Sequence, residues 1–351
     1  MPHELGFSMP PEWAPHLGTW LSWPRDEGVS FPGKCPEVFD VYRQLVAQLA
    51  QVEQVFINVW DDRMIEEAEE FLKLRSDICS NVTFLKHPAN EPWCRDHGPI
   101  FVTNRTSGEK ALIDWGYNAW GEKYPPYDLD NAIPKHIAQL RQIKRFDPKM
   151  ILEGGSIEVD GKGLLMTTES CLMNSNRNPH LSKQEIEQHL RDFLGISKIL
   201  WLGDGIVGDD TDGHIDDMTR FIDESTIVTA VEADPADENY GSLKDNRNRL
   251  DAFNKTQDRP FRIVEIPMPK PVIQEGLRLP ASYANFYIAN RIVIVPTYND
   301  PNDAIALKTI QELVPNRRVI GIDSTTLIWG LGSFHCITQQ EPIEPTMGDS
   351  S

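Results

Sequence analysis

One cysteine near the C-terminus lies among residues suited to nucleophilic chemistry. Cys336 follows a glycine-containing turn and precedes the polar run Thr338-Gln339-Gln340. Upstream, three short segments place acids or a histidine beside glycines: Arg95-Asp96-His97-Gly98-Pro99, Glu153-Gly154-Gly155 and the run from Asp209 to Asp216. A nucleophile needs a base and groups that hold its substrate. The chain supplies these parts at scattered positions, as an active site assembled by folding would.

His214 and Asp216 are the first candidate partners of this cysteine. If their segment is a strand, residues two apart project from one face, and Asp210 or Asp212 would join them from the preceding loop. The His-x-Asp pair is also a plausible set of metal ligands, and it is equally consistent with a solvated acidic turn. Against a metal, no second histidine pair stands at ligand spacing, and His335 would point away from Cys336 on a strand.

The remaining candidates each have a structural alternative. Asp96 precedes a glycine–proline turn, where an aspartate commonly caps the turn. Cys94 is a rival nucleophile, but a buried filler is the expected role of such a cysteine. Trp93 and Trp120 could wall an apolar slot or pack in the core. Glu153 begins a predicted strand, and a lone Glu-Gly-Gly is a weak signal.

A cluster of carboxylates with one histidine and one cysteine suits a guanidinium substrate. Clustered carboxylates repel one another unless a cation joins them. Guanidinium is planar and permanently charged, and it offers donors in a fork that carboxylates accept pairwise. A thiolate could then attack its central carbon. Carboxylates, however, raise the pKa of a nearby thiol, so a cationic substrate or a protonated His214 must offset them. We therefore predict that substrate binding helps to activate Cys336.

Composition limits the class of protein. The 351 residues are 40% hydrophobic and 25% charged, which allows one large domain or two smaller ones. The formal net charge of -19 argues against nucleic acid and anionic membranes as partners and favours a small cationic substrate. We predict no signal peptide and no spanning segment. Five cysteines without a C-x-x-C pair indicate a reducing, cytoplasmic compartment.

The elements that must position these residues follow a recurring pattern. A hairpin, a helix and a strand recur at about 100–160, 156–202, 218–266 and 286–322, with a degenerate copy expected near the N-terminus. Such units suggest an α/β ring or propeller whose strand ends converge on a central cavity. We predict a single domain, 1–351, with a core over about 9–341 and a loose tail over 342–351. Helices are predicted over 36–51, 63–73, 131–144, 182–195, 238–255 and 300–313.

Several motifs together resemble those of a known family. They are Trp93-x-Arg95-Asp96-x-Gly98-Pro99, Glu153-Gly154-Gly155-Ser156, Asn174-x-Asn176-Arg177-Asn178-Pro179, Thr211-Asp212-Gly213-His214-Ile215-Asp216, Ala281-Ser282-Tyr283-x-Asn285-Phe286-Tyr287-Ile288-Ala289-Asn290 and His335-Cys336-Ile337-Thr338-Gln339-Gln340. In order and type they resemble the agmatine deiminases of the bacterial-type peptidyl-arginine deiminase family. The resemblance covers residues from about 9 to 341.

The resemblance implies a five-bladed α/β propeller, the pentein fold, with no cofactor and no metal. It implies that Cys336 is the nucleophile that forms an amidino-cysteine intermediate and that His214 is the acid and base. Asp96, Asp210 and Asp216 would grip the guanidinium, and Glu153 would orient His214 or join the grip. Trp93 and Trp120 would contact the substrate. Agmatine would give N-carbamoylputrescine, on a route to putrescine, and a homo-oligomer is left open.

Two departures from the family pattern keep other substrates open. The family usually shows a Gly-Gly-Gly-Asn turn before His-Cys, where this chain has Gly330-Leu331-Gly332-Ser333-Phe334, and Cys94 stands where Met or Thr is expected. Peptidyl arginine or another alkyl-guanidine is therefore the alternative substrate. Free arginine is less favoured because its carboxylate would need a cation. A metal-dependent hydrolase using His214 and Asp216, and a non-catalytic binder of guanidines or polyamines, are the alternatives from other classes.

Overall fold

Four segments of the chain repeat one local order in the computed structural model, which describes residues 1–346 of 351. In each, two antiparallel strands form a hairpin, a helix follows, and a third strand pairs in parallel with the second. The strands are β4 (Ile100–Thr103), β5 (Lys110–Ile113), β6 (Lys144–Phe146), β7 (Ile157–Val159), β8 (Leu164–Thr168), β9 (Lys198–Leu202), β10 (Thr219–Asp223), β11 (Thr226–Val231), β12 (Arg262–Pro267), β15 (Tyr287–Ile288), β16 (Ile292–Thr297) and β17 (Arg318–Asp323).

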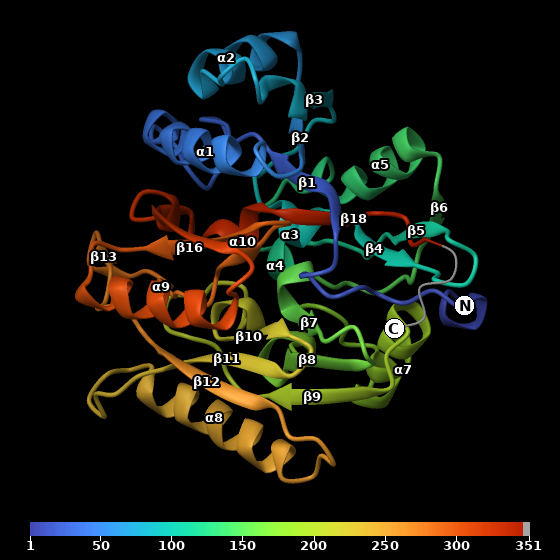
Figure 1. The fold of residues 1–351 in the computed structure, drawn as a ribbon, viewed down its shortest axis with the longest axis vertical. Helices are drawn as coiled ribbons and strands as arrows, with labels where there is room; N and C mark the ends of the chain where they lie inside the picture. The colour runs from blue at the N-terminus through green and yellow to red at the C-terminus, as the bar shows by residue number, and fades with distance from the viewer. Residues whose placement is uncertain (347–351) are drawn as a thin grey trace.

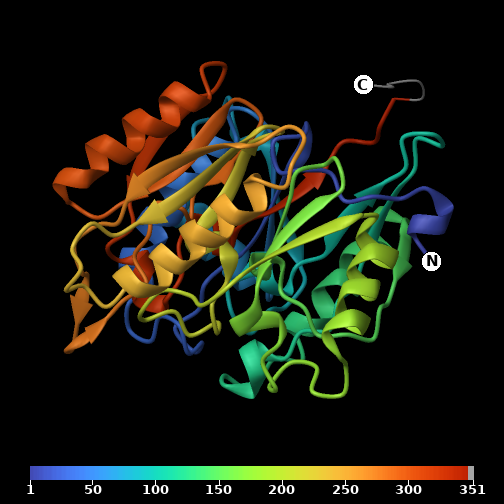
Figure 2. The same cartoon turned by 90° about the horizontal axis from the view of Figure 1, so that it is seen from below.

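Amphipathic helices connect the second and third strands and cover the sheets (Figures 1 and 2). The connecting helices are α5 (Ile133–Arg141), α7 (Lys183–Leu194), α8 (Tyr240–Asn254) and α9 (Pro301–Leu313). The predicted capping box opens α7, where the Ser182 side chain accepts from the Glu185 N–H, and left-handed Gly195 (φ 67°) ends it. Its face of Ile186 and Leu190 is buried. Local sequence therefore defines these helices well.

The fifth sheet is built from both ends of the chain. Its order is β18 (Gln339–Pro342), β1 (His16–Ser22), β2 (Gln54–Val59) and β3 (Val82–Lys86). Strand β18 pairs antiparallel with β1, and helix α1 (Cys35–Leu49) leads to β2, which is parallel to β1. In Figure 1 the red C-terminal strand lies beside the blue N-terminal one. The expected degenerate N-terminal copy thus completes its strand pair with the C-terminal segment.

A buried carboxylate fixes this C-terminal strand. The side chain of Glu341 is 0% exposed and accepts from Lys110 Nζ (2.7 Å), Trp20 Nε1 (2.8 Å) and Arg141 Nη2 (2.8 Å). Lys110 is also buried and belongs to β5 of the neighbouring sheet. Glu341 therefore joins β18 to β1, to β5 and to α5 through charge-assisted hydrogen bonds.

Contacts link each sheet to another. Strand β18 contacts β4, β7 contacts β10, α9 contacts β12 and α1 contacts β17. The link between the β4 and β7 sheets is made by two one-turn helices, α3 (Cys94–His97) and η4 (Gly154–Ser156). The result is a mixed α/β fold in which sheets of similar build share side-by-side contacts.

One-turn helices stand directly before the first strand of several sheets. Helix α3 precedes β4, η4 precedes β7, η5 (Ile215–Asp217) precedes β10, and α10 (Phe334–Ile337) precedes β18 by one residue. Neighbours in this set contact one another. The strand geometry expected for His214 and Asp216, and for Cys336, is therefore wrong, because these residues lie at or within single helical turns. One turn is too short to produce a periodic sequence signal.

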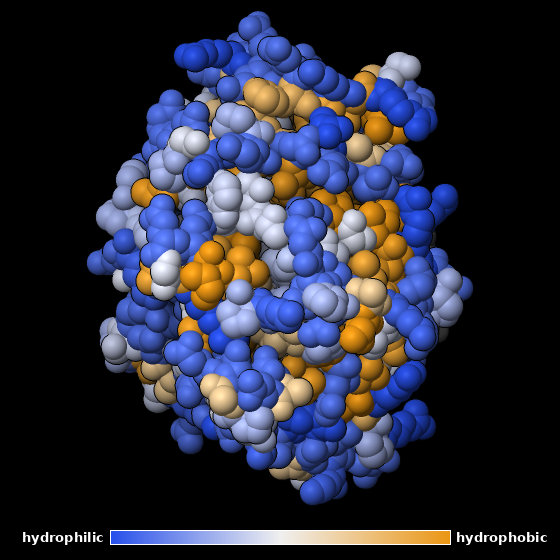
Figure 3. Space-filling view, turned by 90° about the vertical axis from the view of Figure 1, so that its left-hand side faces the viewer, coloured by the Kyte–Doolittle hydropathy of each residue, from blue (hydrophilic) through white to orange (hydrophobic). Residues whose placement is uncertain are grey.

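The remaining elements are short or peripheral. Strands β13 (Ile273–Gln274) and β14 (Leu277–Arg278) form an additional hairpin that the sequence pattern missed. The face shown in Figure 3 is mainly hydrophilic, with apolar residues in separate groups. The other helices are η1 (His3–Leu5), α2 (Asp62–Leu72), η2 (Cys79–Asn81), α4 (Ala119–Glu122), η3 (Asp130–Ala132), α6 (Glu169–Leu172) and η6 (Leu327–Gly330).

Two predictions concern the ends and the membrane. The predicted tail, 342–351, falls partly on residues 347–351, which lie outside the described residues. Pro342 ends β18, and the Ile343 N–H donates to the Pro15 carbonyl at 3.0 Å. Within residues 1–346 the model contains no helix with the length and apolar character that crossing a membrane requires.

Lys110→Ala is expected to lower the free energy of unfolding by about 3 kcal/mol, because it leaves the buried Glu341 carboxylate with one cation fewer. Urea unfolding followed by circular dichroism measures this change. Lys308→Ala is the matched control, since the Lys308–Glu312 pair is exposed and 3.9 Å long, and it should change stability little. Equal losses in the two variants would contradict a special role for Glu341.

Candidate active site

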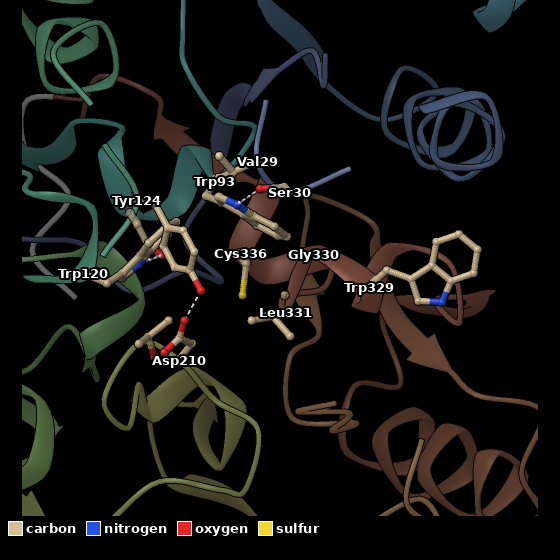
Figure 4. Close-up of a pocket in the computed structure, with 13 residues that line it drawn as sticks. Val29, Ser30, Trp93, Trp120, Tyr124, Asp210, Trp329, Gly330, Leu331 and Cys336 are labelled. Carbon is tan, nitrogen blue, oxygen red and sulfur yellow. Dashed lines mark hydrogen bonds between the residues drawn. The ribbon is translucent and has the colours of Figure 1, made fainter. Parts of the chain in front are cut away.

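Cys336 lies at a pocket formed by residues from distant parts of the chain (Figure 4). Its thiol is only 6% exposed, and it extends from α10 into a space of about 550 Å³ that includes the part open to solvent. The lining residues are Val29, Ser30, Trp93, Asp96, Trp120, Tyr124, Asp210, Thr211, Trp329, Gly330, Leu331, Gly332 and Cys336. Four residues predicted from sequence to contact substrate or act in catalysis therefore line one pocket with the predicted nucleophile.

Asn285 holds the thiol and the turn that carries it. Its Nδ2 lies 3.0 Å from Cys336 Sγ and donates to Asp217 Oδ1 at 2.9 Å. Its Oδ1 accepts from the backbone N–H of His335 at 3.0 Å. Asn285 lies in the loop just before β15, the first strand of its sheet. Helix α10, which carries Cys336, has the equivalent position before β18. One side chain thus fixes both the position and the hydrogen bonding of the sulfur.

Asp96, His214 and Asp216 converge on the backbone of Gly155. The Gly155 N–H donates to Asp96 Oδ1 at 3.0 Å, and His214 Nδ1 lies 3.7 Å from the same oxygen. A β-carbon at Gly155 would come within 2.6 Å of His214 Nδ1, 2.8 Å of Asp96 Oδ1 and 3.0 Å of Asp216 Oδ2. Glycine is therefore required here for close approach, and the structure brings these three predicted residues together.

Several buried polar atoms of His214, Glu153 and Asp216 have no hydrogen-bond partner within residues 1–346. They are both ring nitrogens of His214, Oε2 of Glu153 and Oδ1 of Asp216. The side chains of all three residues are at most 1% exposed. Buried polar atoms are rarely left unpaired, so these atoms mark positions where a bound molecule would donate or accept a hydrogen bond.

Glu153 is held on one side only. Its Oε1 accepts from Arg177 Nε at 2.6 Å, and Arg177 Nη1 donates to Asp212 Oδ2, also at 2.6 Å. Arg177 belongs to the motif from Asn174 to Pro179, but no site role was predicted for it from the sequence. The arginine fixes the carboxylate and leaves Oε2 free.

Charge states in the pocket follow from burial. Burial, then Asp216 and Asp217, raises the pKa of the Cys336 thiol well above its usual range. Burial, then Arg177, lowers the pKa of His214 well below its usual range. The free protein therefore holds a neutral thiol and a neutral imidazole near pH 7. Of the two sources of positive charge considered from the sequence, only a cationic ligand remains to stabilise the thiolate.

The two predicted tryptophans are both buried and part of the pocket wall. Trp93 Nε1 donates to Ser30 Oγ at 2.8 Å, and Trp120 Nε1 donates to Asp96 Oδ2 at 3.0 Å. Trp120 has φ 55°, and Ala119 beside it has φ 50°. Non-glycine residues rarely adopt this left-handed conformation, which costs about 1–2 kcal/mol each. Such strain is typical of functional sites, and here it presents the indole to both Asp96 and the pocket.

Asp210 lies apart from the buried acids. Its side chain is 39% exposed, and it accepts a hydrogen bond from the Tyr124 hydroxyl, as Figure 4 shows. Lys123 Nζ lies 3.4 Å from Asp210 Oδ1. The pocket therefore carries buried carboxyl groups on one side and a partly exposed carboxylate on another.

Two groups of side chains have donor atoms within 4.8 Å of one another, close enough in spacing for a cation. One is Glu153, Cys171 and His214, and the other is Asp216, Asp217 and Cys336. The His-x-Asp pair considered as metal ligands from the sequence is divided between these groups. Donor spacing alone does not assign a metal, and other contacts already hold Glu153 and Asp217.

Sequence patterns did not indicate Asn285, Arg177, Glu12 or Tyr124 as site residues. Asn285 had one signal, since it belongs to the motif from Ala281 to Asn290 that resembles the family. Glu12, in the N-terminal segment, contacts His335 Nε2 at 2.7 Å. Nothing near Glu12 in the sequence indicates that contact, because its partner lies at the other end of the chain.

Comparisons with known proteins agree with this geometry. The family model described as Porphyromonas-type peptidyl-arginine deiminase matches residues 8–342. An agmatine deiminase of Pseudomonas fluorescens is 36% identical over 365 residues, which cover 97% of each chain. A solved agmatine deiminase of Enterococcus faecalis has a TM-score of 0.89 at 33% identity and covers 98% of both chains. An agmatine deiminase of C. jejuni with substrate bound has a TM-score of 0.87 at 33% identity, with 97% coverage of both.

A match over nearly the whole chain, in sequence and in structure, establishes the assignment. The chain belongs to the Porphyromonas-type peptidyl-arginine deiminase family.

Proposed function

We propose that this protein is an agmatine deiminase, which hydrolyses agmatine to N-carbamoylputrescine and ammonia on a route to putrescine. The observation that carries the proposal is the distribution of acids around Cys336. Asp96 and Asp216 are buried beside the thiol, and Asp210 is partly exposed on the same pocket. The relatives named above as agmatine deiminases support the same substrate.

Agmatine carries a positive charge at each end, and the pocket offers acids to both. The guanidinium would lie between Asp96 and Asp216, whose planar carboxylates can accept its paired donors. The alkyl chain would pass the rings of Trp93 and Trp120, and the ammonium would meet Asp210. Free arginine would bring its own carboxylate toward Asp210 and would be repelled. This arrangement favours a substrate with an amine and no acid at its far end.

The chemistry proceeds through a covalent intermediate. Cys336 Sγ attacks the guanidinium carbon, and His214, which is neutral in the free protein, accepts the thiol proton. The C–N bond then breaks as His214 returns that proton to the departing ammonia, leaving an amidino-cysteine. Water, activated by His214, attacks the same carbon, and the S–C bond breaks to give the ureido product. Glu153 would hold His214 in position during both steps.

We further propose that the five sheets form a five-bladed α/β propeller around this pocket. The contacts that link each sheet to another support this arrangement. So does the place of the site residues, because each sheet contributes from the segment just before its first strand. The same proposal includes a single domain over 1–351 and a cytoplasmic location. The location is supported by the five cysteines, which are all free thiols.

Ammonia and ureido-product release should be seen with agmatine and should be at least about 10³-fold slower in Cys336→Ala, because no other group replaces the nucleophile. The assay compares agmatine, peptidyl arginine and free arginine, with EDTA present throughout. Cys79→Ser, which changes an exposed cysteine, is the matched control and should keep full activity.

Other outcomes of this assay would each point to a different function. Turnover of peptidyl arginine alone would keep the mechanism and replace the substrate. Loss of activity with EDTA would favour a metal-dependent hydrolase. Agmatine binding without turnover of any of the three compounds would identify a non-catalytic binder.

Asp210→Asn should raise KM for agmatine by about tenfold or more while changing kcat less. The variant removes a charge that would meet the ammonium end of agmatine and not the reacting guanidinium. An alkylguanidine that lacks the amine provides the control, since its kcat/KM should be the same in both proteins. Steady-state kinetics on the two compounds measures the difference. An equal loss with both compounds would place Asp210 at the guanidinium instead.

Agmatine should bind the Cys336→Ala protein more weakly as the pH falls through about 7. Burial, with the charge of Glu153, raises the pKa of Asp96 to about 7, so the carboxylate is lost below that pH and retained above it. Affinity should fall by up to about tenfold per pH unit below this pKa. Calorimetric titration measures it, and a variant that also carries Asp96→Asn should bind weakly without this step. Persistence of the step would assign it to another group.

A further inference from the structure

His335 bridges two buried carboxyl groups. Its Nδ1 lies 2.6 Å from Asp216 Oδ2, and its Nε2 lies 2.7 Å from Glu12 Oε2. All three side chains are at most 6% exposed. These are the short distances of charge-assisted hydrogen bonds. The residue precedes the nucleophile in sequence, yet the mechanism above gives it no role.

The bridge needs two hydrogens. A neutral imidazole carries one N–H and cannot donate to two carboxylates at once. Either His335 is an imidazolium, or one carboxyl group carries a proton and donates it to a ring nitrogen. Because no third arrangement makes both bonds, the three side chains together hold two exchangeable protons.

Glu12 is the ionised member of the pair. Its other contacts are all with donors: Arg220 Nη2 at 3.0 Å, Arg95 Nη2 at 3.3 Å and the Ile288 N–H at 2.7 Å. One hydrogen of the bridge therefore lies on His335 Nε2 and points to Glu12. The second lies between His335 Nδ1 and Asp216 Oδ2.

The surroundings place that second hydrogen on Asp216 in the free protein. Burial, then Asp96, raises the pKa of Asp216 well above its usual range, and burial, then Arg220 and Arg95, lowers the pKa of His335. The charged and titratable groups around the bridge are Arg95, Arg220, Asp96, Asp209, Asp217, Glu158 and Cys336. Without a bound cation, an Asp216 carboxylate would be buried near the acid Asp96, which is costly.

We propose that His335 is a positioning residue that takes the Asp216 proton when a guanidinium binds. The Oδ2–H bond breaks and an Nδ1–H bond forms across the existing hydrogen bond, while the electron pair stays on Asp216. The product is a carboxylate whose Oδ1, which has no partner within residues 1–346, is free to accept from the cation. The imidazolium then lies between two carboxylates. The proposal rests on the proposed function, since it assigns Asp216 to the guanidinium.

The transfer has two physical consequences. Asp216 stays neutral until the cation binds, so the empty site avoids a buried carboxylate beside Asp96. No proton has to leave the closed site for Asp216 to ionise, so its ionisation adds no pH dependence to binding. In the absence of His335, the same ionisation would have to release a proton to solvent.

Histidine ¹⁵N NMR of the Cys336→Ala protein tests the transfer directly, before and after adding agmatine or, separately, guanidinium chloride. One histidine should change from the neutral to the imidazolium pattern with either ligand. The change should persist with His214→Gln, which removes the histidine predicted as the acid and base, and the buried His16 should stay constant. A His335 that is neutral in both states, or charged in both, would overturn the proposal.

A second readout uses binding. His335→Gln can still donate to Asp216 but cannot take its proton, so agmatine affinity in the Cys336→Ala background should fall about tenfold or more near neutral pH and recover as the pH rises. A pH-independent loss would indicate a merely structural role. If wild-type protein does not turn over agmatine while guanidinium still changes the His335 signal, the proposed function fails and this inference stands.

Discussion

The buried carboxylate of Glu12 and the two guanidinium groups around it support the rest of the site. Although burial acts to raise it, the pKa of Glu12 is lowered by Arg220, His335 and Arg95. Arg95 extends from α3 to Gln339 and Gln340 on the C-terminal strand. Arg220 extends from β10 to the Ala284 and Phe286 carbonyls. Because each charge satisfies several partners, the ion cluster ties the segments that carry Asp96, Asn285 and Cys336 into one geometry.

That cluster explains how acids can be concentrated beside the predicted nucleophile, Cys336. Glu12 and Arg220 neutralise one layer, while Asp96 and Asp216 form a second layer that lacks cations of its own. The second layer is stable when empty because burial favours its neutral forms. The atoms it leaves unpaired are those that a guanidinium would satisfy. The empty site thus contains protonated acids and unpaired acceptor atoms, and both can bind a cation.

The sequence predicted the elements with strong periodicity or caps, and it predicted residues whose types carry chemistry. Helix α7 was predicted from Ser182 and Gly195, and the family resemblance predicted Cys336 as nucleophile and His214 as acid and base. The sequence alone could not show that β18 completes the sheet of β1, since their pairing joins opposite ends of the chain. Nor could it place Cys336 on a single helical turn, which has no period to detect. Glu12 was missed for the same reason as the pairing of β18, because its contact with His335 joins opposite ends of the chain and forms only on folding.

The position of Cys336 at the end of this network bears on selectivity. Burial and the nearby acids keep the pKa of the Cys336 thiol high, so a neutral ligand leaves the sulfur unreactive. A guanidinium both presents the electrophilic carbon and supplies the charge that lowers the thiol pKa. Ligand charge is then a condition for reaction as well as for binding. A neutral analogue of the same shape would be discriminated against twice, by weaker binding and by a thiol that stays protonated.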